Sequence, residues 1–371
     1  MTKTESAIPQ DQGWIERVRG RAWKTRAPLS ATLELTSRCN LRCQHCYLGD
    51  QGEQHKKRSL ERDTEAVKAS LREWADAGAL YLLITGGDPM MRKDFAELYR
   101  YARELGMLVT VFCDGILVTD KIISLFQELP PRKVEISIYG ATPETYESVT
   151  RVPGSHAAAW RGIHRLLDAG ITVALKTVMM TLNEHEMEDM AAQAESLGLK
   201  FRHDAAIFPC LPDSSKDPLN LRVAPERVVS YDLADPKRLE HWQKAVHKLD
   251  QFPVSDRLYT CGAGATGFYC DPYGALSPCL MTTHYRYEQG SRSFQDLWDN
   301  ELGFIRKKKR SRSDSCLTGP QRAACTHCPA MNYLESGDEE QESDYMRETT
   351  LLRYKAILKS AGTGDHDASI K

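Results

Sequence analysis

The chain has no long apolar run and no large excess of either charge. None of its segments approaches the roughly 18 uninterrupted apolar residues that a membrane-spanning helix needs, and residues 1–10 do not have the pattern of a signal peptide. The formal net charge is −2, from 49 basic and 51 acidic residues, which argues against the basic surface that nucleic-acid binding requires. We therefore expect a cytoplasmic protein that acts on neither membranes nor nucleic acids.

Cysteine, in contrast, is abundant and unevenly distributed. Eleven cysteines gather toward the two ends of the 371-residue chain. An odd number in two groups suits metal thiolates in a reducing compartment better than a secreted disulfide framework. The length permits a large core and two domains.

Three cysteines directly follow a short apolar strand predicted at residues 31–35. Cys39, Cys43 and Cys46 have the spacing C-x3-C-x2-C. Thiolates this close can bind an iron–sulfur cluster, and three ligands for four irons leave one iron open for chemistry. Buried thiols, disulfide partners or half of a zinc site are the alternatives. Zinc usually takes paired C-x2–4-C elements and a fourth ligand, and His45, between two of the cysteines, would reach the same metal only with strain.

This run reads Cys-Asn-Leu-Arg-Cys-Gln-His-Cys-Tyr over residues 39–47. It resembles the signature of the radical S-adenosylmethionine (SAM) enzymes, in the branch that includes the pyrroloquinoline quinone peptide-crosslinking enzyme. The resemblance implies a 4Fe–4S cluster whose open iron binds the amino and carboxylate groups of SAM, with His45 beside the cofactor. One electron then splits SAM into methionine and a 5′-deoxyadenosyl radical, which abstracts hydrogen from a substrate.

Residues 33–207 alternate between apolar strands and amphipathic helices, several of which end at glycine. Six strands, each but the last followed by a helix, predict an α/β fold with a parallel sheet covered by helices. The resemblance specifies a partial (β/α)6 TIM-like barrel. Function on such sheets lies at the carboxyl ends of the strands. The strands are predicted at 31–35, 80–84, 108–112, 134–138, 172–179 and 199–202, and the helices at 63–77, 93–105, 119–129, 156–169 and 184–197.

Polar residues at three strand ends are candidates for binding SAM. Gly86 and Gly87 let a ligand approach the backbone, and the carboxylate of Asp88 suits an ammonium group; a structural turn is the plain alternative. By resemblance these residues match the Gly-Gly-Glu motif that holds the methionine amino group, with an acid one methylene shorter. Ser137 matches a serine near the ribose and carboxylate, and Arg151 matches the arginine that neutralises that carboxylate. A strand-end serine and a surface arginine are the ordinary alternatives.

A second cysteine group lies near the C-terminus. Two cysteines on a predicted hairpin and a later C-x2-C loop supply four thiolates, enough to hold a 4Fe–4S cluster or zinc: Cys261, Cys279, Cys325 and Cys328. The arrangement C-x12-Gly-x4-C resembles the SPASM/twitch auxiliary domain, which implies an auxiliary 4Fe–4S cluster, one as in the twitch form. Cys270 and Cys316 are too few for another cage, and the sequence leaves open whether either is a ligand.

The remaining cysteines, Cys113 and Cys210, are expected to be inert thiols. At the end of the third predicted strand, Cys113-Asp114-Gly115 stands where relatives often have Thr-Asn-Gly.

The chain is predicted to have five parts. A basic N-terminal extension (1–30) forms a helix on the barrel, and the radical SAM partial barrel (31–207) follows. Then come a linker and substrate-facing segment with one helix at 239–249 (208–258), a small SPASM/twitch domain (259–336), and a C-terminal helix and tail (337–371).

Relatives with this pairing of domains most often modify ribosomally synthesised precursor peptides by cross-linking, epimerisation or oxidation. The resemblance also implies an electron donor, such as a flavodoxin, ferredoxin or reductase, and leaves open a separate leader-binding protein. Oxidation of a small molecule such as an amino sugar and a haem-pathway decarboxylation are the alternative reactions. Sulfatase maturation is disfavoured because Leu280, not Asp, follows Cys279. A zinc-stabilised binding protein without catalysis would use the same cysteines. No catalytic side chain is identified.

Overall fold

The computed structural model describes residues 12–210, 216–249, 254–312, 318–326 and 328–360. The strands are β1 (Ser30–Glu34), β2 (Tyr81–Thr85), β3 (Leu108–Cys113), β4 (Lys133–Ser137), β5 (Val173–Val178), β6 (Lys200–Asp204), β7 (Gly267–Cys270), β8 (Ala275–Ser277) and β9 (Tyr287–Glu288). The helices are α1 (Gln12–Thr25), α2 (Gln51–Lys56), α3 (Thr64–Asp76), α4 (Phe95–Glu104), α5 (Asp120–Glu128), α6 (Pro143–Thr150), α7 (Ser155–Asp168), α8 (Met187–Ser196), α9 (Pro225–Ala234), α10 (Pro236–His247), α11 (Phe294–Leu297), α13 (Pro329–Ser336) and α14 (Asp344–Ser360).

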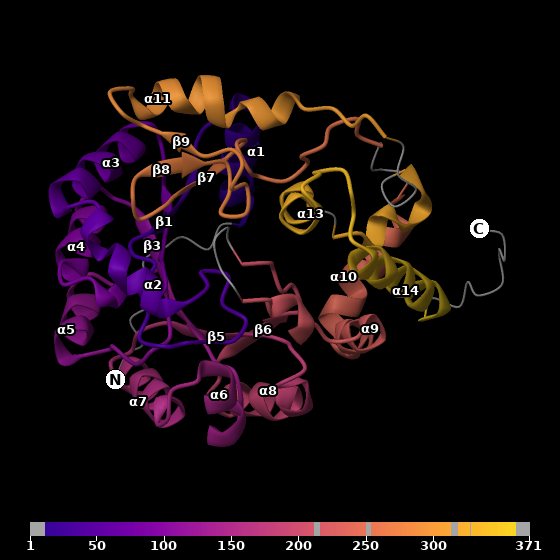
Figure 1. Cartoon of the computed structure of the whole chain (residues 1–371), viewed down its shortest axis with the longest axis horizontal. Helices are drawn as coiled ribbons and strands as arrows, with labels where there is room; N and C mark the ends of the chain where they lie inside the picture. Colours follow the sequence, from indigo (N-terminus) through magenta and orange to yellow (C-terminus); the bar gives the residue numbers. More distant parts are fainter. Residues whose placement is uncertain (1–11, 211–215, 250–253, 313–317, 327, 361–371) are drawn as a thin grey trace.

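The first six strands form a parallel sheet in sequence order, and the whole sheet runs β6-β5-β4-β3-β2-β1-β7-β8-β9. Helices α3 to α8 lie on its outer side (Figure 1). The predicted α/β fold, a partial (β/α)6 barrel, is therefore confirmed. Helix α6 was missed, because its eight residues follow β4 as an extra helix before α7.

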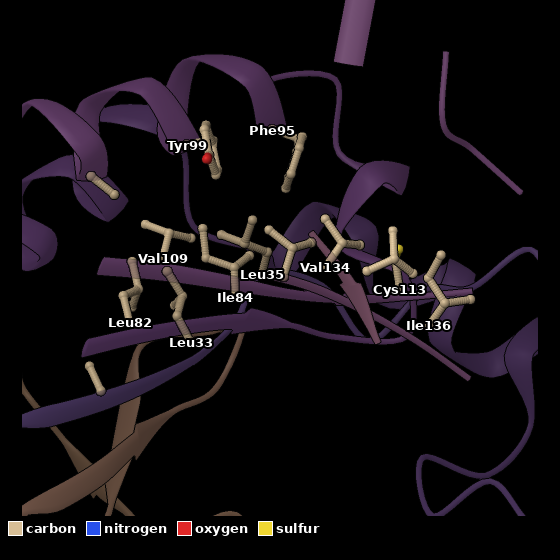
Figure 2. Packing of buried hydrophobic residues seen from close by; sticks show 14 of the residues in the cluster. Leu33, Leu35, Leu82, Ile84, Phe95, Tyr99, Val109, Cys113, Val134 and Ile136 are labelled. Carbon is tan, nitrogen blue, oxygen red and sulfur yellow. The ribbon is translucent and has the colours of Figure 1, made fainter. Parts of the chain in front are cut away.

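The outer face of the barrel sheet is apolar and buried. Leu33, Ile84, Val109 and Val134 pack beneath the helices, and Phe95 of α4 lies over them (Figure 2). Successive side chains of a strand point to opposite faces, so the alternate residues point into the barrel. Many of these inner residues are only half-buried. Burial of the outer face stabilises the fold, and the inner face keeps space near the strand ends.

The sheet continues beyond the barrel into the C-terminal cysteine region. β7 pairs in parallel with β1, from Ser30↔Gly267 to Leu33↔Cys270, and β8 pairs antiparallel with β7. The predicted hairpin is confirmed, and its turn is closed by the Asp271 carboxylate, which accepts from the backbone of Tyr273 and Ala275. The pairing with β1 was not predicted.

The segment predicted as an irregular linker with one helix contains two helices, α9 and α10. They meet at Asp235–Pro236, where the Asp235 side chain caps α10. The predicted C-terminal helix is confirmed as α14, and it packs on α9 through Arg353, which donates two hydrogen bonds to the buried Asp232 carboxylate at 2.8 and 3.0 Å.

The N-terminal basic stretch forms helix α1, which contacts the C-terminal cysteine region rather than resting on the barrel alone. The Arg306 guanidinium lies over the Trp23 ring at 5.1 Å, and Trp298 Nε1 donates to the carbonyl of Arg26 at 2.8 Å. The helical prediction is right, and the expected packing partner was incomplete. Among the described residues, none of the helices combines the length and the apolar character needed to cross a bilayer.

Candidate active site

The first three cysteines lie in the loop that follows β1, at the mouth of the barrel. The backbone of this loop is held by the end of α6, because Arg42 N donates to Thr150 O at 2.9 Å and Gln44 N donates to Val149 O at 3.0 Å. The structure brings Cys39, Cys43 and Cys46 together, so that each thiol influences the ionisation of its neighbour.

The three thiols are buried, and their surroundings favour the protonated form unless a metal is bound. Burial raises the pKa of Cys46 to about 11 and raises the pKa of Cys39 and Cys43 well above the ordinary range, so a bound metal would have to displace these protons. The backbone N–H of Leu41 already points at Cys39 Sγ, 3.4 Å away. Among the described residues, no three His, Cys, Asp or Glu side chains converge closely enough to hold a single ion. A four-iron cube separates its cysteine ligands more widely than a single ion does.

Gly86 and Gly87 support the cysteine loop from below. Gly87 N donates to Thr36 O at 2.8 Å, and a side chain at Gly87 would place its Cβ 2.3 Å from Arg38 O. A Cβ at Gly86 would meet Thr36 O at 2.4 Å. The glycines are therefore required by the close approach of the loop backbone, whereas the sequence suggested the approach of a ligand.

The carboxylate of Asp88 is turned toward the backbone. It is fully buried and accepts from Met90 N at 2.8 Å and from Asp114 N at 3.0 Å. Burial and the neighbouring Asp88 raise the pKa of Asp114 well above its usual range. Asp114 Oδ2 is buried without a hydrogen-bond partner among the described residues. This oxygen is the better candidate for a ligand ammonium, and the only signal for it in the sequence was the departure from Thr-Asn-Gly.

His45 and Ser137 meet through Tyr139. The His45 ring lies edge-on to the Tyr139 ring with centroids 4.8 Å apart, and the Tyr139 hydroxyl is hydrogen-bonded to Ser137. Burial lowers the pKa of His45 to about 4, and its Nδ1 has no hydrogen-bond partner among the described residues. Unpartnered buried polar atoms at the barrel mouth fit a polar cosubstrate such as SAM.

Arg151 ends α6 in the left-handed backbone region, at φ 59°. The preceding residue, Thr150, anchors the cysteine loop, so Arg151 borders the loop. Its side chain is exposed.

Two residues of the linker also contact the cysteine loop. The Cys210 thiol donates to Cys46 O at 3.3 Å. Lys216 Nζ donates to Cys43 O at 3.4 Å and to Gly49 O at 3.2 Å. No spacing rule indicated these contacts, because Cys210 and Lys216 are more than 160 residues from the cysteine loop in the sequence and meet it only in the fold.

Cations line the barrel interior beside Ser137. Lys176 of β5 is in register with Ser137 of β4 and Arg202 of β6, so the three residues share one face. The Lys176 ammonium lies 3.1 Å from the centroid of the Phe112 ring, and burial lowers its pKa to about 7.

The acidic residue on this inner face, Glu135, already pairs with two other cations. Glu135 accepts from Arg202 at 2.8 Å and from Lys133. Among the described residues, no acceptor is in hydrogen-bond contact with Lys176. Lys133 and Arg202 outnumber Glu135 on this wall, and Lys176 adds a further positive charge when it is protonated, which suits an anionic group of a ligand.

A buried acid lies at the end of β1. Glu34 Oε2 accepts from the Tyr269 hydroxyl of β7, and Oε1 accepts from Ser37 at 3.2 Å. Burial raises the pKa of Glu34 to about 7. The sequence gave no signal for this pair, because it joins strands 235 residues apart.

The C-terminal cysteines are gathered from separate segments. Cys261 precedes β7, Cys279 follows β8, and Cys328 begins α13. Cys261 and Cys328 both lie close enough to Cys279 to help raise its pKa, and Cys261 acts in the same way on Cys328. Backbone N–H groups at the start of α13 point at Cys328, and Met281 N donates to Cys279 Sγ at 3.4 Å. Such amide donors favour thiolates, as a cluster requires.

The other cysteines differ in their surroundings. Cys325 Sγ lies 3.8 Å from Glu342 Oε1. Cys270 is fully buried in β7, where its sulfur accepts from Arg62 at 3.3 Å, away from the other cysteines of the group. Cys113 is buried, as predicted. Cys316 lies outside the described residues.

Comparisons with known proteins agree with this geometry. The model of the Radical SAM superfamily matches residues 33–194. An AdoMet-dependent heme synthase of Oleidesulfovibrio alaskensis is 32% identical over 352 residues, which cover 88% of each chain. The mycofactocin maturase MftC of Mycolicibacterium smegmatis is 28% identical over 313 residues, 82% of this chain and 77% of MftC.

Among solved structures, Streptococcus suis SuiB bound to its precursor peptide SuiA has a TM-score of 0.66. The match covers 92% of this chain and 83% of SuiB at 16% identity, so it shows a common fold. The sequence relationship and the fold extend through both cysteine regions. The chain therefore belongs to the radical SAM superfamily, and it is an enzyme that uses a 4Fe–4S cluster and S-adenosylmethionine.

Proposed function

We propose that the enzyme modifies a ribosomally synthesised precursor peptide, by cross-linking, epimerisation or oxidation. The observation that carries this proposal is the likeness to MftC, a maturase, over 82% of the chain. The fold shared with SuiB, whose structure holds a precursor peptide, supports it.

In this proposal Cys39, Cys43 and Cys46 hold the 4Fe–4S cluster. The bound cluster and SAM would supply the 5′-deoxyadenosyl radical that removes hydrogen from the substrate. The role of Gly86 and Gly87 is to let the loop pack closely. Their own carbonyl groups would face the methionine end of SAM.

The remaining candidate residues would orient SAM. Asp114 Oδ2 would accept from the methionine ammonium, with Asp88 fixing the Asp114 backbone. Ser137 would bind near the ribose and carboxylate, and His45 would supply its unpartnered Nδ1. Arg151 would turn from solvent toward the methionine carboxylate.

We propose one auxiliary 4Fe–4S cluster on Cys261, Cys279, Cys325 and Cys328. Three of these thiols already interact in the structure. Cys325 would have to turn from Glu342 toward the others. This cluster would accept the electron left after hydrogen abstraction, or anchor the substrate.

The excess positive charge around Lys176 would bind a carboxylate of the substrate. Its position in register with Ser137 places this charge beside the proposed SAM site. Acidic side chains of a precursor peptide would satisfy it.

The partners would be the precursor peptide and an electron donor of the flavodoxin, ferredoxin or reductase kind, with room for a separate leader-binding protein. The many thiols needed for metal binding favour a reducing compartment, the cytoplasm.

The test is anaerobic reconstitution with iron, sulfide, SAM and reductant, together with the peptide encoded beside the gene. We expect about eight irons per chain, from two four-iron clusters, formation of 5′-deoxyadenosine, and a mass change in the peptide. Cleavage of SAM without any change in that peptide would contradict the proposed substrate and leave the superfamily assignment intact.

A second candidate substrate is a porphyrin with propionate side chains. The heme synthase of Oleidesulfovibrio alaskensis is more similar to this chain than MftC is, at 32% against 28% identity, and the cations around Lys176 would also bind propionates. Incubation of the same reconstituted enzyme with iron coproporphyrin III separates the two candidates, because loss of carbon dioxide from the porphyrin would favour this one.

A further inference from the structure

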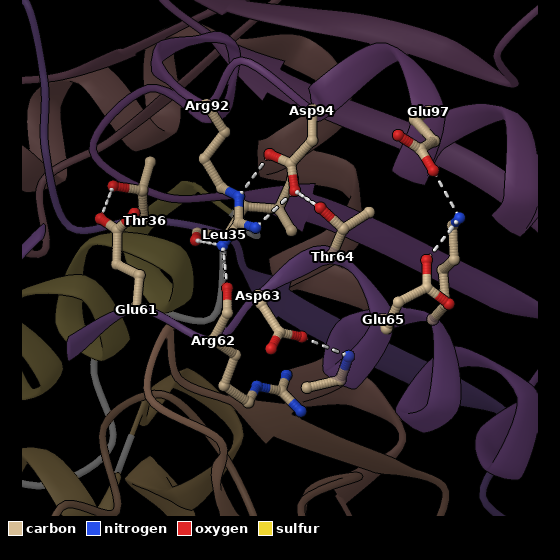
Figure 3. Close-up of polar contacts among 12 residues, drawn as sticks. Leu35, Thr36, Glu61, Arg62, Asp63, Thr64, Glu65, Arg92, Asp94 and Glu97 are labelled. Carbon is tan, nitrogen blue, oxygen red and sulfur yellow. Dashed lines mark hydrogen bonds and ion pairs between the residues drawn. The ribbon is translucent and has the colours of Figure 1, made fainter. Parts of the chain in front are cut away.

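A basic pocket lies on the outer surface next to the first cysteine loop. Its volume is about 420 Å³. It is formed by the 3-10 helix η1 (Lys57–Leu60), the start of α3 and the segment that leads into α4. Figure 3 shows polar contacts in and around it, among them the Arg92–Asp94 pair and the Thr36–Glu61 hydrogen bond. Its lining side chains are Arg38, Arg58, Glu61, Arg62, Thr64, Met91, Arg92, Lys93 and Asp94.

The two acidic residues of this pocket are paired with arginines that also line it. Glu61 accepts from the Arg38 guanidinium through both oxygens, at 2.9 and 3.0 Å, in a nearly buried pair. Asp94 accepts from Arg92 at 2.6 and 2.9 Å. These two pairs stabilise the base of the pocket and leave its rim cationic.

Two exposed cations line the pocket, Arg58 and Lys93, and Lys57 precedes Arg58 in the same 3-10 helix. Among the described residues, no carboxylate forms an ion pair with Lys57, Arg58 or Lys93, and all three are exposed. Leu60, at the end of the same 3-10 helix as Lys57 and Arg58, is 65% exposed. Exposed cations without acidic partners next to an exposed apolar side chain suit a protein-docking surface.

Helix α2, which directly precedes η1, holds the first cysteine in place. Gln51 Oε1 accepts from Cys39 N at 2.7 Å, and His55 Nε2 is 3.1 Å from Cys39 O. Arg38, which lines the pocket, is the residue before Cys39. The basic rim and the proposed cluster site are therefore joined by adjacent residues of the chain.

We propose that Lys57, Arg58, Leu60 and Lys93 form the docking surface for an acidic one-electron carrier protein. The carrier would be oxidised by one electron, and the cluster on Cys39, Cys43 and Cys46 would be reduced by the same electron, with no bond or proton transferred. The proposal rests on the proposed function only in requiring that cluster. Complementary charge raises the rate of association and makes it depend on salt.

The test compares reduced flavodoxin, an acidic carrier, with dithionite, a small reductant that needs no docking. The variant is the full-length reconstituted enzyme with Lys57→Glu, Arg58→Glu and Lys93→Glu. We expect flavodoxin binding at least tenfold weaker and flavodoxin-driven reduction of the cluster, followed by absorbance, slower by a similar factor. Reduction by dithionite should stay within twofold of the wild type.

The matched control reverses three exposed lysines on α10, its C-cap and α14, Lys237→Glu, Lys248→Glu and Lys355→Glu, which changes the net charge equally. Arg58→Glu alone serves as the milder variant if the triple one folds poorly. Unchanged flavodoxin binding, an equal loss in the control, or an equal loss with dithionite would each overturn the proposal. If the wild type binds flavodoxin and is reduced but does not cleave SAM, the proposed function fails and the docking surface stands.

Discussion

The two cysteine regions are built in opposite ways. The first places Cys39, Cys43 and Cys46 within eight residues of one loop, which Gly87, Arg38 and α6 fix to the barrel. The second draws its thiols from the ends of a hairpin and the start of α13, and Cys261 is exposed. The spacing of cysteines in the sequence is therefore enough to indicate the first site. The second site depends on how distant segments pack together.

The largest difference is expected when single cysteines of each region are removed. Cys43→Ala should abolish formation of 5′-deoxyadenosine, because two thiolates cannot hold the cluster. Cys279→Ala should leave SAM cleavage within about tenfold of the wild type and prevent substrate turnover, because the first cysteine loop is held by other residues. Iron content and 5′-deoxyadenosine report the two effects. Complete loss of SAM cleavage in Cys279→Ala would show that the regions are not independent.

The support of the first loop can be broken without touching a sulfur. Gly87→Ala places a Cβ 2.3 Å from Arg38 O, so the loop must move. We expect about a 100-fold loss of SAM cleavage, the cost of misplacing a reacting group by about 1 Å. Gly170→Ala is the control, since nothing lies within 4 Å of its Cβ position. It should cost about 1 kcal/mol of stability because of its φ of 73°. Equal activity of the two variants would contradict the loop argument.

The barrel interior offers a sharper test, because no acceptor among the described residues is in hydrogen-bond contact with Lys176. Lys176→Met should raise the KM for an acidic substrate about tenfold, as expected for the loss of a charged hydrogen bond. The KM for SAM in substrate-free cleavage should stay unchanged, and Lys176→Arg should restore most of the affinity. A rise in the KM for SAM instead would assign the ammonium to the methionine carboxylate.

The smallest effects are expected in the pH dependence of stability. Burial raises the pKa of Glu34 to about 7, so its contribution is present at acid pH and is lost as pH rises from about 4.5 to 7. Glu339, in the second region, accepts from Tyr259, His284 and Lys308. These hydrogen bonds hold its pKa near 2 against the cost of burial. Its contribution is present above pH 4.5 and is lost as pH falls toward 2.

The opposite pH dependences expected for Glu34 and Glu339 can be checked by measuring the denaturant midpoint of unfolding between pH 3 and 8. Glu34→Gln should flatten the decline between pH 4.5 and 7 and should therefore be relatively more stable above pH 7. Glu339→Gln should be less stable above pH 4.5. Parallel pH curves for the two variants would contradict the assignment.

The sequence predicted the barrel well because its signals are local. Strands such as 108–112 are apolar runs bounded by glycine, and the structure has β3 at Leu108–Cys113. The cysteine loop follows from spacing and a strand end. The side chain of Asp88 could not be oriented in this way, because its partner Asp114 belongs to the next β/α unit.

Contacts between distant segments were also missed. Glu34 meets Tyr269, and Cys210 meets Cys46, only after the chain has folded. No sequence pattern predicts that β7 pairs with β1, because the short β7 sequence would suit an isolated hairpin equally well.

Because β7 pairs with β1, the C-terminal cysteine region also completes the hydrogen bonding of the barrel sheet. With β7 removed, the N–H and C=O groups of β1 on that side would lie unpaired, and a bare parallel edge is a template for aggregation. A shortened enzyme ending before residue 259 should therefore precipitate rather than persist as a smaller catalyst. A related enzyme without this region would need another segment to pair with the free edge of β1.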